Sequence, residues 1–170
     1  MILIVILISV FQFNNSVIEW SSKKCISWDM YKSKIPSSSK FSAITKIEVQ
    51  MEITEYASDS SSFKVYTKLI PEESWVKSDR TEHLLQHEQT HFNIAKVYSV
   101  ILENELNYCC YFDSNSELID LLFSKYNDKI SNLQTAYDIE TNYSKNIPCQ
   151  YEWNEYVNKK LDSLGLGGLK

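Results

Sequence analysis

The chain has 170 residues, of which 44% are hydrophobic and 13% aromatic, a composition typical of a globular protein with a hydrophobic core. The formal net charge is −5 and no basic run follows the pattern expected for phosphate-backbone binding, which argues against a nucleic-acid partner. All three glycines lie in the last six residues, so a glycine-rich nucleotide-binding loop at a strand–helix junction is excluded.

The first residues, MILIVILISVFQF, form an unbroken apolar run. The run has about the length of a signal-peptide core and is too short to span a bilayer comfortably. We therefore expect residues 1–20 to be an export signal or short anchor, with a buried strand as the alternative, and residues 21–170 to form a single domain. Export would place the protein in the periplasm, outside the cell or in the envelope, with membrane contact only through the apolar N-terminus if it is not cleaved.

The cysteines are Cys25, Cys109, Cys110 and Cys149. An exported protein can keep disulfides, although an adjacent Cys109–Cys110 bridge would strain the intervening peptide. Buried free thiols are the equally weighted alternative. No Cys-x-x-Cys spacing supports a cysteine zinc site.

Two segments have the alternating pattern of half-buried strands, residues 47–54 and residues 63–69. The polar tract 57–62 between them predicts a turn. Pro71 predicts the end of the second strand, because proline cannot donate to a strand ladder. The two strands are expected to form an antiparallel hairpin or meander.

From Ser78 onward the hydrophobic period becomes helical. The pattern predicts a helix capped by Ser78 or Asp79 and ending near Leu106, a second helix opening at a capping box in residues 114–117, and a third with Pro148 in its first turn. Strands followed by helices indicate an α+β domain, here N-terminal antiparallel strands followed by three helices.

The first predicted helix contains HEQTH, from His87 to His91, in a chain with three histidines. Residues four apart on a helix project from the same side, so the two imidazoles can bind one metal ion at about 2.0–2.1 Å. Glu88 lies one step around the helix, where a carboxylate can take a proton from a zinc-activated water and pass it to a leaving amine. The pattern predicts a zinc hydrolase site.

The alternative is a chance spacing on a structural helix, because HExxH also occurs without metal. Three features favour the metal site. Apolar neighbours such as Leu84 and Phe92 indicate a buried helix, where unliganded histidines would need other partners. Histidine is otherwise scarce, and the preceding hairpin offers a sheet edge for an extended substrate. His83 is interpreted as an exposed helix residue, because three successive turns cannot all point at one ion.

Several segments together resemble a bacterial family of predicted secreted zinc-dependent proteases. They are ISWDMYKSKIP, AITKI, EESWVKS, LLQHEQTHFNIA, AYDIETNYSKN and CQYEWNEYVNKKL, which cover most of the chain after the apolar start. The resemblance implies a zincin-like fold, a Zn2+ ion on His87 and His91, and Glu88 as general base acting on a peptide or protein substrate.

The resemblance also implies a third zinc ligand, and there the chain departs from the family. The family pattern has a histidine where this chain has Tyr143 in YDIETNY. Tyr143 is the expected third ligand through its phenolate, and Glu140 is the alternative. Asp138 is expected to accept a hydrogen bond from a ligand histidine. The sequence thus predicts a secreted zinc metallopeptidase, with a catalytically inactive zincin-fold binding or envelope-associated module as the alternative.

Overall fold

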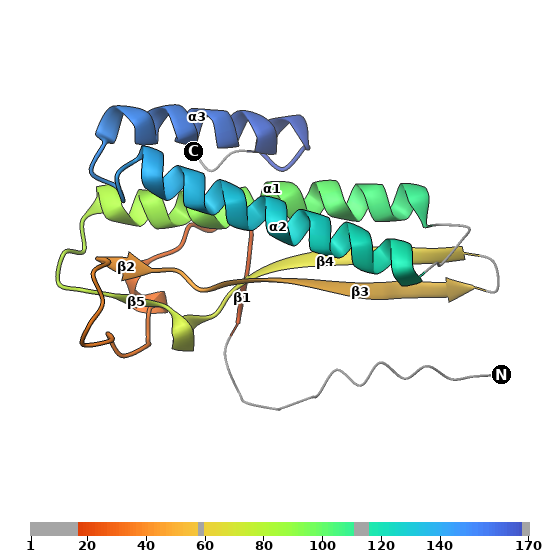
Figure 1. Cartoon of the computed structure of the whole chain (residues 1–170), viewed down its shortest axis with the longest axis horizontal. Coiled ribbons are helices and arrows are strands. Elements are labelled where there is room, and N and C mark those ends of the chain that lie inside the picture. The colour runs from red at the N-terminus through yellow and green to blue at the C-terminus, as the bar shows by residue number, and fades with distance from the viewer. Residues whose placement is uncertain (1–16, 58–59, 111–115, 168–170) are drawn as a thin grey trace.

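An antiparallel hairpin forms most of the sheet in the computed structural model, which describes residues 17–57, 60–110 and 116–167 (Figure 1). Strands β3 (Ile47–Ala57) and β4 (Ser60–Leu69) pair along their whole length, with a register shift between Ile53 and Glu55. Strand β1 (Ile18–Glu19) pairs with the other edge of β4, so the strand order is β1-β4-β3. The two predicted strands are confirmed, but the turn predicted at 57–62 is too long, because Ser60, Ser61 and Ser62 pair with β3.

A second sheet has only two short strands, β2 (Ala43–Ile44) and β5 (Trp75–Val76), which are antiparallel. Two short 3-10 helices flank it, η1 (Trp28–Met30) and η2 (Pro71–Glu73). Pro71 ends the hairpin as predicted, because β4 stops at Leu69 and the chain turns into η2. Neither β2 nor β5 was predicted, since two-residue strands are too short to show a period.

Three helices follow the strands, α1 (Glu82–Cys109), α2 (Ser116–Glu140) and α3 (Ile147–Ser163). The expectation that Ser78 or Asp79 caps α1 is wrong: Thr81 is the N-cap, and its hydroxyl accepts a hydrogen bond from the Leu84 N–H at 3.2 Å. Pro148 lies in the first turn of α3 as predicted, behind the N-cap Asn146. The predicted capping box of the second helix falls partly on residues outside those described.

Helix α1 lies in the middle of the molecule, between the sheet and the other two helices (Figure 1). One side of α1 contacts β4, and its other sides contact α2 and α3. Apolar residues of α2 and α3 are buried in the core on the side of α1, including Tyr126, Ile130, Tyr137, Val157 and Leu161. The observed architecture is therefore α+β, with antiparallel strands followed by three helices.

Buried polar side chains on α1 attach the N-terminal segment to the helix. The Trp20 indole N–H donates to Asn93 Oδ1 at 2.8 Å, and Gln89 Nε2 donates to the same oxygen at 2.9 Å. Gln89 Oε1 accepts from the Ile26 backbone N–H at 2.8 Å. Unpaired, these groups would each cost free energy in the core, so the pairing fixes the segment on α1.

The folded part of the chain includes residues 18–20, since β1 pairs with β4 and Trp20 is buried in the core. Most of the expected export segment lies outside the described residues, and export stays a prediction. None of the helices within residues 17–57, 60–110 and 116–167 is both long and apolar enough to cross a membrane. Cys25, Cys109 and Cys149 are free thiols.

Replacing Asn93 by alanine is expected to destabilise the fold by about 2–3 kcal/mol, because the Trp20 and Gln89 donors would both lose their acceptor in the core. Urea unfolding followed by tryptophan fluorescence measures this free energy. The control is Asn132→Ala, an exposed position on α2 that should change stability by no more than about 0.5 kcal/mol. Equal stability of the two variants would contradict the anchoring role.

Candidate metal centre

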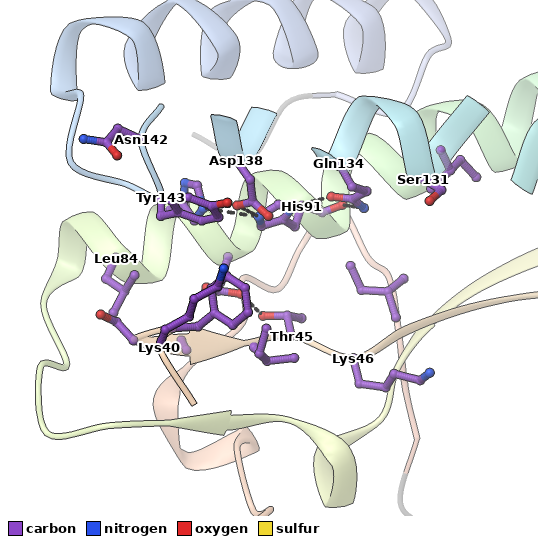
Figure 2. Close-up of a pocket in the computed structure, with 18 of the residues that line it drawn as sticks. Lys40, Thr45, Lys46, Leu84, His91, Ser131, Gln134, Asp138, Asn142 and Tyr143 are labelled. Carbon is purple, nitrogen blue, oxygen red and sulfur yellow. Dashed lines mark hydrogen bonds and ion pairs between the residues drawn. The ribbon is translucent and has the colours of Figure 1, made fainter. Parts of the chain in front are cut away.

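An open groove of about 710 Å3 runs between the strands and α2, with α1 as its floor (Figure 2). One wall is the segment 40–47, which contains β2, together with Val49 of β3. The other wall is the face of α2 from Asn127 to Asp138, and the turn at 142–145 closes one end. The groove wall is therefore formed largely by β2 and its flanking residues and only partly by the predicted hairpin.

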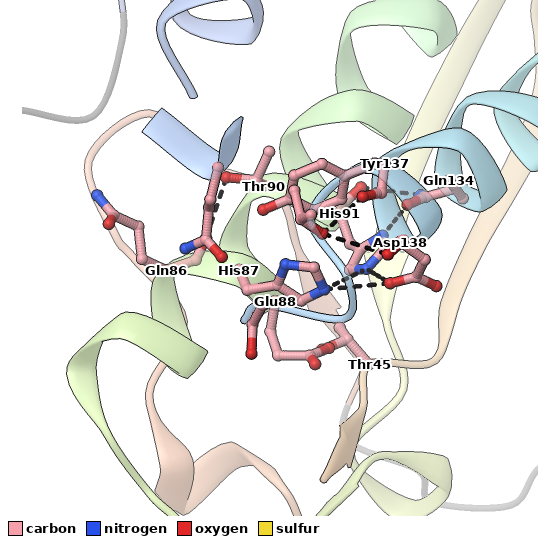
Figure 3. A network of polar contacts seen from close by, with 12 residues as sticks. Thr45, Gln86, His87, Glu88, Thr90, His91, Gln134, Tyr137 and Asp138 are labelled. Atoms are coloured by element: carbon pink, nitrogen blue, oxygen red, sulfur yellow. Dashed lines mark hydrogen bonds and ion pairs between the residues drawn. The ribbon is translucent and has the colours of Figure 1, made fainter. Parts of the chain in front are cut away.

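Three side chains that could together hold a metal ion converge on the floor of this groove, His87 and His91 from α1 and Asp138 from α2 (Figure 3). Asp138 Oδ1 lies 3.1 Å from Nε2 of each histidine, and the two Nε2 atoms lie 3.2 Å apart. In a tetrahedral site with bonds of about 2.0–2.1 Å, neighbouring ligand atoms are separated by roughly 3.3 Å. The three atoms thus have the spacing of one face of a tetrahedral metal site.

Local helix geometry explains why the two histidines lie together. They are four residues apart on α1, and their rings meet edge to face at a centroid distance of 4.7 Å. Tyr137 of α2 stacks on His87 at 4.5 Å and contacts His91 at 4.9 Å, which limits the rotation of both rings. His87 is 3% exposed, and its Nδ1 is buried without a hydrogen-bond partner, so its Nε2 side alone faces polar groups.

Gln134 of α2 determines which nitrogen of His91 carries the proton. Its amide Nε2 donates to the backbone oxygen of His91 at 2.9 Å, so the other end of the amide must be the carbonyl Oε1. That oxygen accepts from His91 Nδ1. In the neutral imidazole Nδ1 therefore carries the proton and Nε2 is free to bind a metal, whereas in the charged form Nε2 also carries a proton and donates it to Asp138.

The charges of the site favour a cation at this point. Burial lowers the pKa of His91, but the hydrogen bond with Asp138 and the charges of Glu88 and Asp138 outweigh burial and raise it. Burial would raise the pKa of Asp138, but hydrogen bonds from His87 and His91 lower it below the usual range. Asp138 is thus ionised at neutral pH. A proton and a metal ion compete for the space between the three atoms, so metal affinity should fall on acidification.

Glu88, the predicted general base, lies beside the triad and lines the groove although it is only 5% exposed. Its Oε2 accepts a hydrogen bond from Thr45 Oγ1 at 2.5 Å, and Thr45 follows β2 directly (Figure 3). A buried carboxylate with one oxygen hydrogen-bonded keeps a second oxygen available for proton transfer. The arrangement can hold a cation next to a proton acceptor.

Tyr143, the expected third ligand, lies at the closed end of the same groove (Figure 2). Helix α2 ends at Glu140, and Asn142, Tyr143 and Ser144 all have left-handed backbone with φ of 47°, 53° and 71°. The Tyr143 ring packs on Phe41 of the opposite wall at a centroid distance of 5.5 Å. The triad brought together by the fold contains Asp138 in place of Tyr143, and a ligand role for Tyr143 stays a prediction.

The remaining candidate residues have other partners. Glu140, the alternative third ligand, accepts a hydrogen bond from Trp153 Nε1 at 2.7 Å. His83 is partly buried where exposure was expected, and its Nε2 lies 2.6 Å from the Ser144 backbone oxygen. Asp138 was expected only to accept a hydrogen bond from a ligand histidine. Its contact with both imidazoles is consistent with that role and also makes it the third donor of the cluster.

No protein-family model, no characterised protein and no solved structure matches the chain. The family resemblance noted from the sequence motifs therefore stays a hypothesis. The arrangement of His87, His91, Asp138 and Glu88 is the evidence on which a function can be argued.

Asp138→Asn is expected to weaken binding of a divalent metal by at least about tenfold, because an amide supplies no negative charge to the ion. Titration with Co2+, followed by its visible absorption, measures the affinity. Tyr143→Phe serves as the comparison and is expected to bind Co2+ nearly as well as the unmodified protein. The reverse pattern would assign the third ligand to Tyr143.

Gln134→Leu is expected to reduce metal affinity by about 10- to 100-fold, since the His91 ring would lose the partner that fixes its tautomer and orientation. The matched control is Gln86→Leu, an exposed glutamine on α1. Isothermal titration calorimetry of both variants gives the two affinities. If Gln134→Leu binds metal as tightly as the control, the amide contact does not tune the site.

Proposed function

We propose that the protein is a zinc metallopeptidase with a zincin-like site that hydrolyses peptide bonds. The observation that carries this proposal is the convergence of two histidines and a carboxylate next to Glu88 on the floor of an open groove. A buried structural site would be closed on all sides, whereas a catalytic site keeps a position open to substrate.

The donor set supports zinc as the metal. His87, His91 and Asp138 would hold the ion through two imidazole nitrogens and one carboxylate oxygen, a combination found in catalytic zinc sites. When bound, zinc supplies Lewis-acid activation of a water molecule and of the substrate carbonyl. Nε2 of each histidine lies 3.1 Å from Asp138 Oδ1, and the Gln134 contact holds His91 Nδ1, so Nε2 is the atom placed to bind the ion.

Glu88 has the position of the general base. In the proposed reaction the oxygen of water bonds to the substrate carbonyl carbon, and the carbon–nitrogen bond breaks. Glu88 takes a proton from the water and transfers it to the leaving amine nitrogen, so the carboxylate is regenerated. Its position beside the triad and facing the groove supports this role.

The groove wall supports an extended peptide as substrate. Strand β2 pairs with β5 along one edge, and the segment 40–47 lines the groove. An extended peptide can add to a strand edge through backbone hydrogen bonds, with alternate side chains in the groove. Lys40, Lys46 and Lys145 also line the groove, so a substrate with acidic side chains would be attracted to it.

We retain export as part of the proposal, on the basis of the apolar N-terminal run alone. The alternative function is a catalytically inactive binding module with the same fold. It would bind zinc without turnover, and it is favoured if the purified protein cleaves no member of a broad peptide library with zinc present.

Glu88→Gln is expected to lower hydrolysis by about 10²- to 10⁴-fold while zinc content stays near one ion per chain, because glutamine keeps the shape but cannot accept the proton. Cleavage of a fluorogenic peptide library and elemental analysis of the same samples provide the two measurements. Glu82→Gln, an exposed glutamate on α1, is the control and should keep full activity. Full activity in Glu88→Gln would show that another group is the base.

A further inference from the structure

Two residues outside the metal triad form a hydrogen-bonded chain that ends on Glu88. Tyr31 Oη lies 2.5 Å from Thr45 Oγ1, and Thr45 Oγ1 lies 2.5 Å from Glu88 Oε2. Both come from sequence segments noted for their family resemblance, Tyr31 from ISWDMYKSKIP and Thr45 from AITKI. Neither segment contributes a residue to the metal triad, so the two hydroxyl groups have no role in metal binding.

The chain has a fixed direction when Glu88 is ionised. A carboxylate only accepts hydrogen bonds, so the single hydroxyl proton of Thr45 points at Glu88 Oε2. Thr45 then has only its lone pairs left for Tyr31, which must donate its phenolic proton to Thr45. The negative charge of Glu88 thus aligns both side chains. The bond from Thr45 to Glu88 is charge-assisted and is therefore stronger than the neutral bond from Tyr31 to Thr45.

Both members of the chain are held in place by other contacts. The backbone next to Thr45 is fixed on both sides, since Ile44 pairs with Trp75 and the Lys46 N–H donates to Ser74 Oγ at 3.0 Å. Tyr31 is 8% exposed, and its ring meets Trp28 edge to face at 5.0 Å. A hydrogen-bonding group on a rigid support fixes the orientation of its partner.

We propose that Thr45, oriented by Tyr31, is the positioning residue that holds the Glu88 carboxylate in the orientation required for proton transfer. Thr45 occupies Oε2 and prevents the carboxylate from rotating, so the remaining oxygen, Oε1, is the one presented for proton transfer. Thr45 also lies in the groove wall along which an extended substrate would run. The substrate and the base are therefore positioned by the same segment of chain. This inference rests on the proposed peptidase activity.

The kinetic test uses Thr45→Val, which keeps the branched shape and removes the hydroxyl. We expect kcat to fall by about 10- to 100-fold, with KM and zinc content nearly unchanged. Thr45→Ser, which restores a hydroxyl, should recover most of kcat. Tyr31→Phe should cause a smaller loss, and adding it to Thr45→Val should cause no further loss, because Tyr31 acts only through Thr45.

Two matched controls separate positioning from general damage. Thr135→Val changes an exposed threonine on α2, and Tyr151→Phe changes a tyrosine that is 60% exposed on α3. Both should leave kcat unchanged. The inference is overturned if Thr45→Val keeps full kcat, or if Thr45→Ser has a kcat as low as that of Thr45→Val. It is also overturned if the loss of kcat in the double variant equals the product of the losses in Thr45→Val and Tyr31→Phe.

A measurement independent of turnover distinguishes this inference from the proposed function. The buried Tyr31 hydroxyl proton should give a downfield proton NMR resonance, identified by its loss in Tyr31→Phe. We expect the resonance to shift upfield in Glu88→Gln and to shift or broaden in Thr45→Val. If the protein has no peptidase activity but these shifts occur, the proposed function fails and the orientation of Glu88 by this chain stands. A resonance unaffected by both substitutions would show that no chain connects Tyr31 to Glu88.

Discussion

Helix α1 buries an unusual run of polar side chains in the middle of the molecule, and each of them needs a hydrogen-bond partner. The segment from His87 to Asn93 contains five such residues and the partly buried His91, and none of their partners on other elements is local in sequence. His87 meets Asp138, Glu88 meets Thr45, Gln89 meets the Ile26 N–H, Thr90 meets Asn154, His91 meets Gln134 and Asn93 meets Trp20. The N-terminal segment, the residue after β2, α2 and α3 are all attached to α1 in this way.

The polar side chains of α1 form two faces, one with neutral groups and one with ionisable groups. The face toward the N-terminal segment and α3 carries Gln89, Thr90 and Asn93, whose amides and hydroxyl are neutral and tie elements together. The face toward the groove carries the ionisable residues of the motif, and the two histidines share the ionisable partner Asp138. Stability and the proposed catalysis therefore share one helix but use different side chains of it.

The sequence predicted the parts of the site that depend on local geometry. The four-residue spacing of His87 and His91 defines one side of a helix, and the apolar residues around them indicated that the helix is buried. Asp138 was recognised as a hydrogen-bond partner. Its equal distance from both imidazoles depends on how α2 packs against α1, which sequence periodicity does not encode. Gln134, Thr45 and Tyr31 were missed for the same reason. Gln134 could have been found, because it lies one helical turn before Asp138.

The turn after α2 illustrates why Tyr143 was harder to locate than the histidines. Helices commonly end with a glycine in left-handed conformation, but this turn places Asn142, Tyr143 and Ser144 there without one. Each such residue costs on the order of 1 kcal/mol or more, and the surrounding contacts must offset that cost. The His83 contact with the Ser144 oxygen and the Phe41 contact with the Tyr143 ring are two of them.

That strained turn has an evolutionary consequence. Glycine at position 143 would relieve strain and is reachable by selection for stability alone, yet it would remove the Tyr143 ring from the end of the groove. A lineage that needs Tyr143 in the groove must therefore tolerate a less stable turn, whereas a lineage that no longer uses the groove has no reason to keep it. The residue at position 143 in related chains would record which of these two pressures has acted.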